Sequence, residues 1–164
     1  MGRGSIKKCH KCGYEIHCFN GIGILFPLAY EETVPKAKDG EFGEKIEVFF
    51  REHEDGAINA DRVTLCCDGC GFLTNEEDLT MYIPKSLDSK EFTGKTKEEM
   101  DLIKKGQSNP SPWNEILKEC YDEYAKYDHI CKKCGEKMRV VGEGEELRCP
   151  ICKTVLDEEG FHWD

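Results

Sequence analysis

The pattern of apolar and polar positions predicts short strands on either side of glycine-containing turns. In residues 5–26, Ile6 precedes the turn sequence CHKCG, and the segment YEIHCFN then alternates between polar and apolar positions. Such alternation is typical of a half-buried strand. The same succession of strand, turn and strand recurs in DRVTLCCDGCGFL, which leads on to residues 81–83. We expect a β-hairpin at both places.

Helical patterning lies between these two hairpins. Residues 27–38 fit a helix, although Pro35 lacks the amide hydrogen that an interior helical position donates, and we expect it to kink or split the helix. A second helix is predicted over residues 42–52, where Phe42, Ile46, Phe49 and Phe50 share one face. The pair Phe49 and Phe50 either closes a core or marks a partner surface, and core packing is the simpler interpretation.

The second half of the chain combines one predicted helix with two further cysteine turns. Ser111 and Pro112 suit a helix cap and first helical position, and an apolar stripe that begins at Trp113 extends the helix to about Tyr127. The segments HICKKCGEKMRVV and ELRCPICKTVL follow, joined by a glycine-rich turn. Residues 87–110 are charged and poor in large apolar groups, which predicts a linker.

Eight of the eleven cysteines form four C-x-x-C pairs. These are Cys9 and Cys12, Cys67 and Cys70, Cys131 and Cys134, and Cys149 and Cys152. Two cysteines spaced in this way can both reach one tetrahedral ion at about 2.3 Å, and two such turns complete a four-thiolate site. The sequence therefore predicts two Zn²⁺ ions per chain, with iron as the alternative because four thiolates accept either metal.

Proximity in the sequence favours pairing each cysteine turn with its nearest neighbour. Fourteen residues separate Cys134 from Cys149, which suits a connecting hairpin. Fifty-four residues separate Cys12 from Cys67, but loop-closure entropy grows only logarithmically with length. We expect the turns at 9/12 and 67/70 to share one ion and those at 131/134 and 149/152 the other, while two other pairings stay open.

This arrangement predicts an α+β protein built from two small zinc-ribbon modules. Residues 1–86 would form a ribbon with a helical insertion between its β-hairpin knuckles, residues 87–110 a linker, and residues 111–164 a connecting helix and a C-terminal ribbon. Modules of this size bury too little apolar surface to be stable on hydrophobic packing alone. Bound metal would supply the missing stability.

The remaining cysteines are assigned no chemistry. Cys67 stands two residues before Cys70 in the repeated pattern, so the adjacent Cys66 is expected to be a strand residue that faces the core. Cys18 and Cys120 stand alone in apolar surroundings, where a buried thiol behaves as a small hydrophobic group.

Two histidines lie beside the predicted ligands. His10 is inside the first turn and His129 is two residues before Cys131. Because four thiolates already complete each site, we expect both histidines to be exposed or to support the ligands indirectly.

The predicted sites are structural, so we expect no enzymatic activity. A catalytic zinc ion usually keeps three protein ligands and an open position for water, whereas four thiolates fill the coordination shell. The H-x-E arrangement of zinc deaminases is also missing beside the cysteine turns.

The net charge and the hydropathy limit which classes of partner and which cellular compartment we expect for this protein. The formal net charge of −10 argues against general binding to nucleic acid, although residues 129–156 carry six Lys and Arg against four Asp and Glu and leave that role open as an alternative. No segment is long and apolar enough for a membrane span, and the start of the chain lacks the apolar region of a signal peptide. With so many thiols, this predicts a cytoplasmic protein.

Residues 131–155, with CxxCG followed by CPxC, resemble the zinc-ribbon superfamily, which implies two hairpin knuckles around one structural zinc ion. The first module is similar to small bacterial zinc-ribbon proteins of no assigned activity, through CxxCGY, GIGILFP, HEDGAIN and CDGCG. These resemblances imply a bacterial protein but no catalytic residues.

The sequence thus favours a structural zinc-binding protein whose modules serve protein interaction or regulation. An alternative is electron transfer, because the CxxCGY and CPxC segments resemble parts of rubredoxin. These segments lie in different predicted sites, and Lys153 stands where rubredoxin has glycine after its last cysteine.

Overall fold

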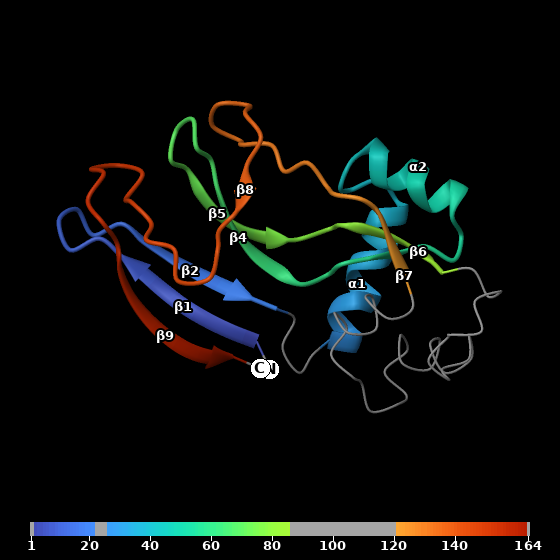
Figure 1. Ribbon diagram of the computed structural model, residues 1–164, viewed down its shortest axis with the longest axis horizontal. Coiled ribbons are helices and arrows are strands. Elements are labelled where there is room, and N and C mark those ends of the chain that lie inside the picture. Colours follow the sequence, from blue (N-terminus) through green and yellow to red (C-terminus); the bar gives the residue numbers. More distant parts are fainter. Residues whose placement is uncertain (1, 22–25, 86–120, 164) are drawn as a thin grey trace. The chain divides into compact units, whose positions relative to one another are not determined.

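A computed structural model describes residues 2–21, 26–85 and 121–163 (Figure 1). The chain divides into two compact units, each assembled from segments that are not contiguous in the sequence. Unit 1 comprises Met1–Ile24, Asp61–Asp78 and Asp128–Asp164, and unit 2 comprises Leu25–Ala60 and Leu79–Tyr127. The two contiguous modules expected over residues 1–86 and 111–164 do not coincide with these units.

Unit 1 contains two three-stranded antiparallel sheets (Figure 1). The first has the order β2-β1-β9, from strands β1 (Gly2–Lys8), β2 (Glu15–Asn20) and β9 (Asp157–Trp163). The second has the order β5-β4-β8, from strands β4 (Arg62–Cys66), β5 (Leu73–Glu77) and β8 (Arg139–Val140). The two hairpins expected around the first two cysteine turns are therefore confirmed.

In its described residues, unit 2 contains two helices and a third antiparallel sheet. The helices are α1 (Phe26–Lys38) and α2 (Glu44–Glu52), and the strands are β3 (Ala57–Ile58), β6 (Met81–Pro84) and β7 (Tyr121–Ala125) in the order β3-β6-β7. The helices predicted over residues 27–38 and 42–52 are confirmed. Pro35 does not split α1, which continues to Lys38. The amide of Asp39 donates to the carbonyl of Pro35 at 2.9 Å, so helical hydrogen bonding continues after the proline.

The apolar face of α2 forms part of the core of unit 2. Ile46, Phe49 and Phe50 are buried at helical spacing, and the rings of Phe49 and Phe50 meet edge to face with their centroids 5.1 Å apart. Ile58 and Met81 are fully buried as well. Core packing is therefore the main role of the two phenylalanines, as the simpler interpretation of the sequence had it.

The predicted helix that was to end near Tyr127 is wrong over its last turns. Residues 121–125 form strand β7, in which Tyr121 pairs with Pro84 and Ala125 pairs with Met81 of β6. Backbone pairing with β6 and burial of Tyr121 outweigh the helical spacing of the tyrosines, because tertiary contacts commonly override local propensity. Residues 111–120 of that helix and the predicted linker lie outside the described residues.

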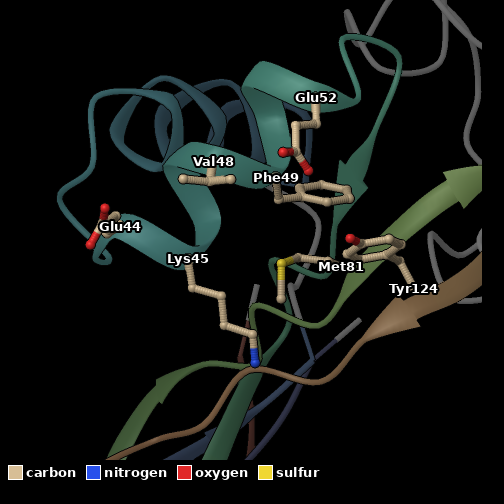
Figure 2. A pocket seen from close by; sticks show the side chains of 7 residues that line it. All are labelled: Glu44, Lys45, Val48, Phe49, Glu52, Met81 and Tyr124. Carbon is tan, nitrogen blue, oxygen red and sulfur yellow. The ribbon is translucent and has the colours of Figure 1, made fainter.

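A cavity of about 390 Å³ opens on unit 2 between α2 and the strands β6 and β7 (Figure 2). It is lined by Glu44, Lys45, Val48, Phe49 and Glu52 of α2, Met81 of β6 and Tyr124 of β7. Within the described part of the chain, no helix has the length and apolar character that crossing a membrane would need.

Candidate metal centres

All four cysteine turns share one backbone hydrogen-bond pattern. The amide of the first cysteine donates to the carbonyl five residues later, at 2.8 Å in the turns that begin at Cys9, Cys131 and Cys149 and at 2.9 Å in the turn that begins at Cys67. The amide four residues later donates back to the carbonyl of the first cysteine, at 2.7 to 3.0 Å. Each turn therefore presents its two cysteines from the same local geometry.

The residue after the second cysteine adopts a left-handed backbone in every turn. Gly13, Gly71 and Gly135 have φ of 75°, 75° and 77°, and Lys153 has φ of 62° in the fourth turn. A side chain in this region costs roughly 1–2 kcal/mol because Cβ crowds the carbonyl oxygen. This requirement explains the glycine of the CxxCG pattern and leaves Lys153 as a strained exception.

The structure gathers the eight predicted ligands into two groups of four. Site A consists of Cys9, Cys12, Cys149 and Cys152, and site B consists of Cys67, Cys70, Cys131 and Cys134. Within each site, all the sulfur atoms lie within 4.8 Å of one another. The expected pairing of nearest neighbours in the sequence is therefore wrong, and the first turn instead joins the fourth while the second joins the third.

The sulfur positions fit one tetrahedral metal ion per site. A tetrahedron with metal–sulfur bonds of about 2.3 Å has edges of about 3.8 Å. In site A, the Sγ of Cys152 lies 3.4 Å from that of Cys9 and 3.8 Å from that of Cys12. In site B, Cys67 and Cys134 are 3.4 Å apart, while Cys70 and Cys131 are 3.6 Å apart. The four sulfurs can close on an ion with shifts of a few tenths of an ångström.

Strand register explains why the turns pair in this way. In site A, Lys8 pairs with Glu15 on one side and with Asp157 on the other. Lys8 immediately precedes the first turn, and Glu15 lies three residues after the second ligand of that turn. Asp157 lies five residues after the last ligand of the partner turn. In site B, Cys66 pairs with Leu73 on one side and with Arg139 on the other. These three residues stand at the same distances from the ligands of site B as Lys8, Glu15 and Asp157 do from those of site A. The two sites thus have one architecture, with site B nested between the two halves of site A.

Each site has an acidic and a basic residue in contact at equivalent positions, and the two residue types exchange places between the sites. Arg139 donates from Nε to both carboxylate oxygens of Asp68, at 2.9 and 3.1 Å, and also bonds Glu145 at 2.6 and 3.0 Å. In site A, His10 Nδ1 lies 3.2 Å from Asp157. The sequence interpretation missed these pairs, although their common spacing from the ligands was a usable signal.

The local environment separates the thiols into easily and poorly ionised groups. Hydrogen bonds from the hydroxyl and amide of Thr154 lower the pKa of Cys152 to about 6. Burial opposes ionisation of Cys131, but the amides of Cys134 and Lys133 and neighbouring sulfurs lower its pKa to about 7.

Crowding of sulfurs has the opposite effect on other ligands. The amides of Tyr14 and Glu136 favour the thiolates of Cys12 and Cys134, but contacts with the other sulfurs of each site outweigh this and raise the pKa of both to about 12. A divalent cation at the centre of each site would favour the thiolate form of all four ligands.

The other cysteines and histidines lie outside the two ligand groups. Cys18 is buried, as predicted, and Cys66 is partly buried against the apolar core beside site A. Cys120 lies outside the described residues. His10 is exposed, whereas His129 is buried, with Nε2 3.1 Å from the carbonyl of Asp78 and Nδ1 3.6 Å from Glu76.

No protein-family model matches the chain, and the searches of curated proteins and of solved structures likewise found no match. The functional conclusion therefore rests on the cysteine geometry. Two four-cysteine groups, each able to hold one ion, indicate a metal-binding protein, and the repeated hairpin turns are consistent with zinc-ribbon-like modules.

Proposed function

We propose that this is a non-enzymatic protein that binds two structural Zn²⁺ ions through sites A and B. The observation that carries the proposal is the approach of four sulfurs in each site to near-tetrahedral separation. Structural zinc sites contribute folding free energy directly, with apparent binding free energies of about 10–16 kcal/mol in small zinc domains. The ions would hold together unit 1, whose three segments are far apart in the sequence.

Elemental analysis and a visible spectrum of the full chain, purified without chelators or an immobilised-metal column, test this proposal. We expect about two zinc atoms per chain, as two four-thiolate sites require, and no colour. Less than one metal atom per chain would overturn the proposal. Iron with red thiolate-to-metal absorption would instead support rubredoxin-like electron transfer, since the donor set accepts either metal.

The protein-interaction role finds support in the cavity of unit 2 (Figure 2). Phe49 and Met81 form a buried apolar floor, and Tyr124, at 48% exposed, contributes a ring 5.2 Å from that of Phe49. The exposed residues Glu44 and Glu52 also line the cavity, so that two acidic residues there outnumber the one basic residue, Lys45, whose ammonium donates to the carbonyl of Lys126 at 3.3 Å. This combination suits a peptide that carries an apolar side chain beside Lys or Arg, because aromatic faces and carboxylates both attract cations.

Binding of a fluorescein-labelled peptide of alternating leucine and arginine, followed by anisotropy, tests this surface. The double change Glu44→Lys and Glu52→Lys should weaken binding at least fivefold, because it replaces attraction by repulsion. The double change Glu41→Lys and Glu54→Lys makes the same change in charge at exposed residues outside the cavity and should have a smaller effect. Equal losses in the two variants would show non-specific attraction and contradict an interaction site here.

Ion pairing of three of its six basic side chains argues against nucleic-acid binding by residues 129–156. Lys132 lies 3.1 Å from Glu76, Lys137 pairs with Asp128, and Arg139 is held by Asp68 and Glu145. Contact with phosphates would compete with these pairs. Salt-dependent binding of the full chain to duplex DNA tests the alternative, and a steep fall in affinity with salt would support it.

A cytoplasmic and bacterial setting belongs to the same proposal. A reducing compartment keeps thiols available as metal ligands, which suits eight cysteines arranged in two clusters.

A further inference from the structure

The sheet β5-β4-β8 lies between two apolar cores, one for each metal site. Core A contains Cys9, Leu73, Leu147, Cys149 and Leu156, with Cys66 and Val141 among the residues packed against it. Core B contains Leu65, Cys67, Cys131 and Met138, with Val63 packed against it. Successive strand residues point to opposite faces. Strand β4 accordingly sends Leu65 to core B and Cys66 to core A.

The turn that supplies Cys67 and Cys70 to site B is flanked by two residues that pack in core A. Cys66 immediately precedes the ligand Cys67, and Leu73 stands three residues after the ligand Cys70. Cys66 and Leu73 face each other across the β4–β5 pair, and both pack in core A, where Leu73 is only 3% exposed. A shift of site A would therefore move the two strand ends that position Cys67 and Cys70.

A second contact runs from site A back to site B. The Lys153 ammonium, in the fourth turn, donates to the carbonyl of Cys70 at 3.4 Å and to that of Pro150 at 3.3 Å. A Cβ atom added at Gly71 would lie 3.1 Å from this ammonium. The second and fourth turns, which belong to different sites, therefore lie against each other.

Nesting adds an entropic link between the sites. Site A alone must close a loop of 136 residues between Cys12 and Cys149. Once site B joins Cys67 to Cys134, the open path is only 68 residues, namely 54 before Cys67 and 14 after Cys134. Halving a flexible loop makes closure roughly threefold more favourable.

We propose that sites A and B bind metal cooperatively, with the β5-β4-β8 sheet as the coupling element. This inference rests on the proposed metal binding and concerns its regulation. Loading of one site orders the sheet and shortens the loop, and both effects raise the affinity of the other. Unit 1 would then pass from the metal-free to the fully loaded state with little of the one-metal form, which makes its folding steeply dependent on metal supply.

Titration of the metal-free chain with Co²⁺, followed by thiolate charge-transfer and d–d absorption, tests this coupling. The variant Cys131→Ser/Cys134→Ser leaves site A intact and removes site B, and Cys9→Ser/Cys12→Ser does the reverse. We expect each remaining site to bind Co²⁺ at least tenfold more weakly than in the intact chain. Both losses should be similar, because coupling between two binding sites is reciprocal.

Leu73 and Leu147 provide a matched pair of probes. Both are leucines in core A and both are 3% exposed, but only Leu73 lies on the coupling sheet. Leu147→Ala should weaken Co²⁺ binding at site A by the same factor with and without site B. Leu73→Ala should weaken it by at least threefold more when site B is intact.

The outcomes separate the two proposals. If the intact chain binds no Co²⁺ in tetrahedral thiolate form, the proposed metal binding fails, and cooperativity fails with it. If it binds two ions and loss of either site leaves the affinity of the other unchanged, metal binding stands and cooperativity is overturned. Equal effects of Leu73→Ala in both backgrounds would overturn the sheet as the coupling element.

Discussion

Asp68 and Arg139 join the two cysteine turns of site B through two hydrogen bonds, at 2.9 and 3.1 Å. Asp68 follows the first ligand of one turn, and Arg139 stands five residues after the last ligand of the partner turn. His10 and Asp157 hold the same two positions in site A, 3.2 Å apart. The two sites therefore share a polar clasp whose acidic and basic members have exchanged places.

The clasp of site B should slow metal loss only modestly. Arg139→Ala is expected to speed release of metal to a chelator by up to about fivefold, because exposed ion pairs contribute at most about 1 kcal/mol. The exchanged pair Asp68→Arg/Arg139→Asp should recover only part of the loss, since the attraction between residues 68 and 139 returns with opposite polarity while Glu145 then faces a carboxylate. Release followed in a chromogenic chelator measures this, and a large effect of Arg139→Ala at high salt would contradict a purely electrostatic clasp.

Separate halves of the chain should not form either site. Residues 1–86 contain only Cys9 and Cys12 of site A and Cys67 and Cys70 of site B, and the other ligands of both sites lie in residues 111–164. We expect neither fragment alone to bind Co²⁺ with the spectrum or affinity of the native sites, and a mixture of the two to regain metal binding. Tight binding of one ion by each fragment would instead support pairing of nearest neighbours.

The adjacent cysteines of β4 and its turn should differ in their effect on metal content. Cys67→Ser should remove about one metal atom per chain, because Cys67 is a ligand of site B. Cys66→Ala should keep both ions, since Cys66 lies outside both ligand groups and packs against core A. Elemental analysis of the two purified variants measures the difference. Equal metal loss in both variants would show that Cys66 also acts as a ligand.

The left-handed turn position offers a direct measure of backbone strain. Gly135→Ala should lower stability by roughly 1–2 kcal/mol, because φ is 77° there and a side chain disfavours this backbone conformation. The added Cβ would meet no atom within 4 Å, so the loss would come from the backbone and not from a steric clash. Lys153→Gly should raise the stability of site A by removing the same strain, offset by loss of the Lys153 contacts with the carbonyls of Cys70 and Pro150. Thermal melting of the metal-loaded variants tests both signs. An unchanged melting temperature in Gly135→Ala would show that this turn tolerates the side chain.

Metal binding should release protons and weaken as the pH falls. Contacts with neighbouring sulfurs help to raise the pKa of Cys12, Cys70 and Cys134 above the ordinary thiol value, so these ligands are protonated near neutral pH and must each lose a proton to bind. Calorimetric titration of Zn²⁺ in buffers of different ionisation enthalpy should therefore show release of at least three protons. Release of fewer than two would contradict the protonation states described for the metal-free sites.

The loss of stability at acid pH depends on the thiols whose pKa is lowered. Their thiolates contribute stability above the ordinary thiol pKa, and this contribution is lost as the pH falls through about 7 for Cys131 and about 6 for Cys152. Site B should therefore lose metal at a higher pH than site A. Metal retention measured against pH in Cys131→Ser/Cys134→Ser and in Cys9→Ser/Cys12→Ser compares the sites, and the reverse order would contradict this assignment.

Local sequence was sufficient for the elements whose formation depends on nearby residues. The CxxCG pattern predicts tight turns because the left-handed position favours glycine, and three of the four turns have it. The apolar spacing of Ile46, Phe49 and Phe50 predicts α2 and its buried face. At residues 121–125 the same kind of spacing predicted a helix, but pairing with β6 produced a strand.

The sequence by itself determined that eight cysteines stand in four turns able to hold metal, because ligand spacing within a turn is a local property. Only the tertiary structure decided which turns share an ion. That choice depends on the pairing of β1 with β9 and of β4 with β8, strands that are far apart in the chain. Loop length could not decide it, because the entropy of closing a long loop changes little with length, whereas strand pairing and core packing distinguish one partner from another.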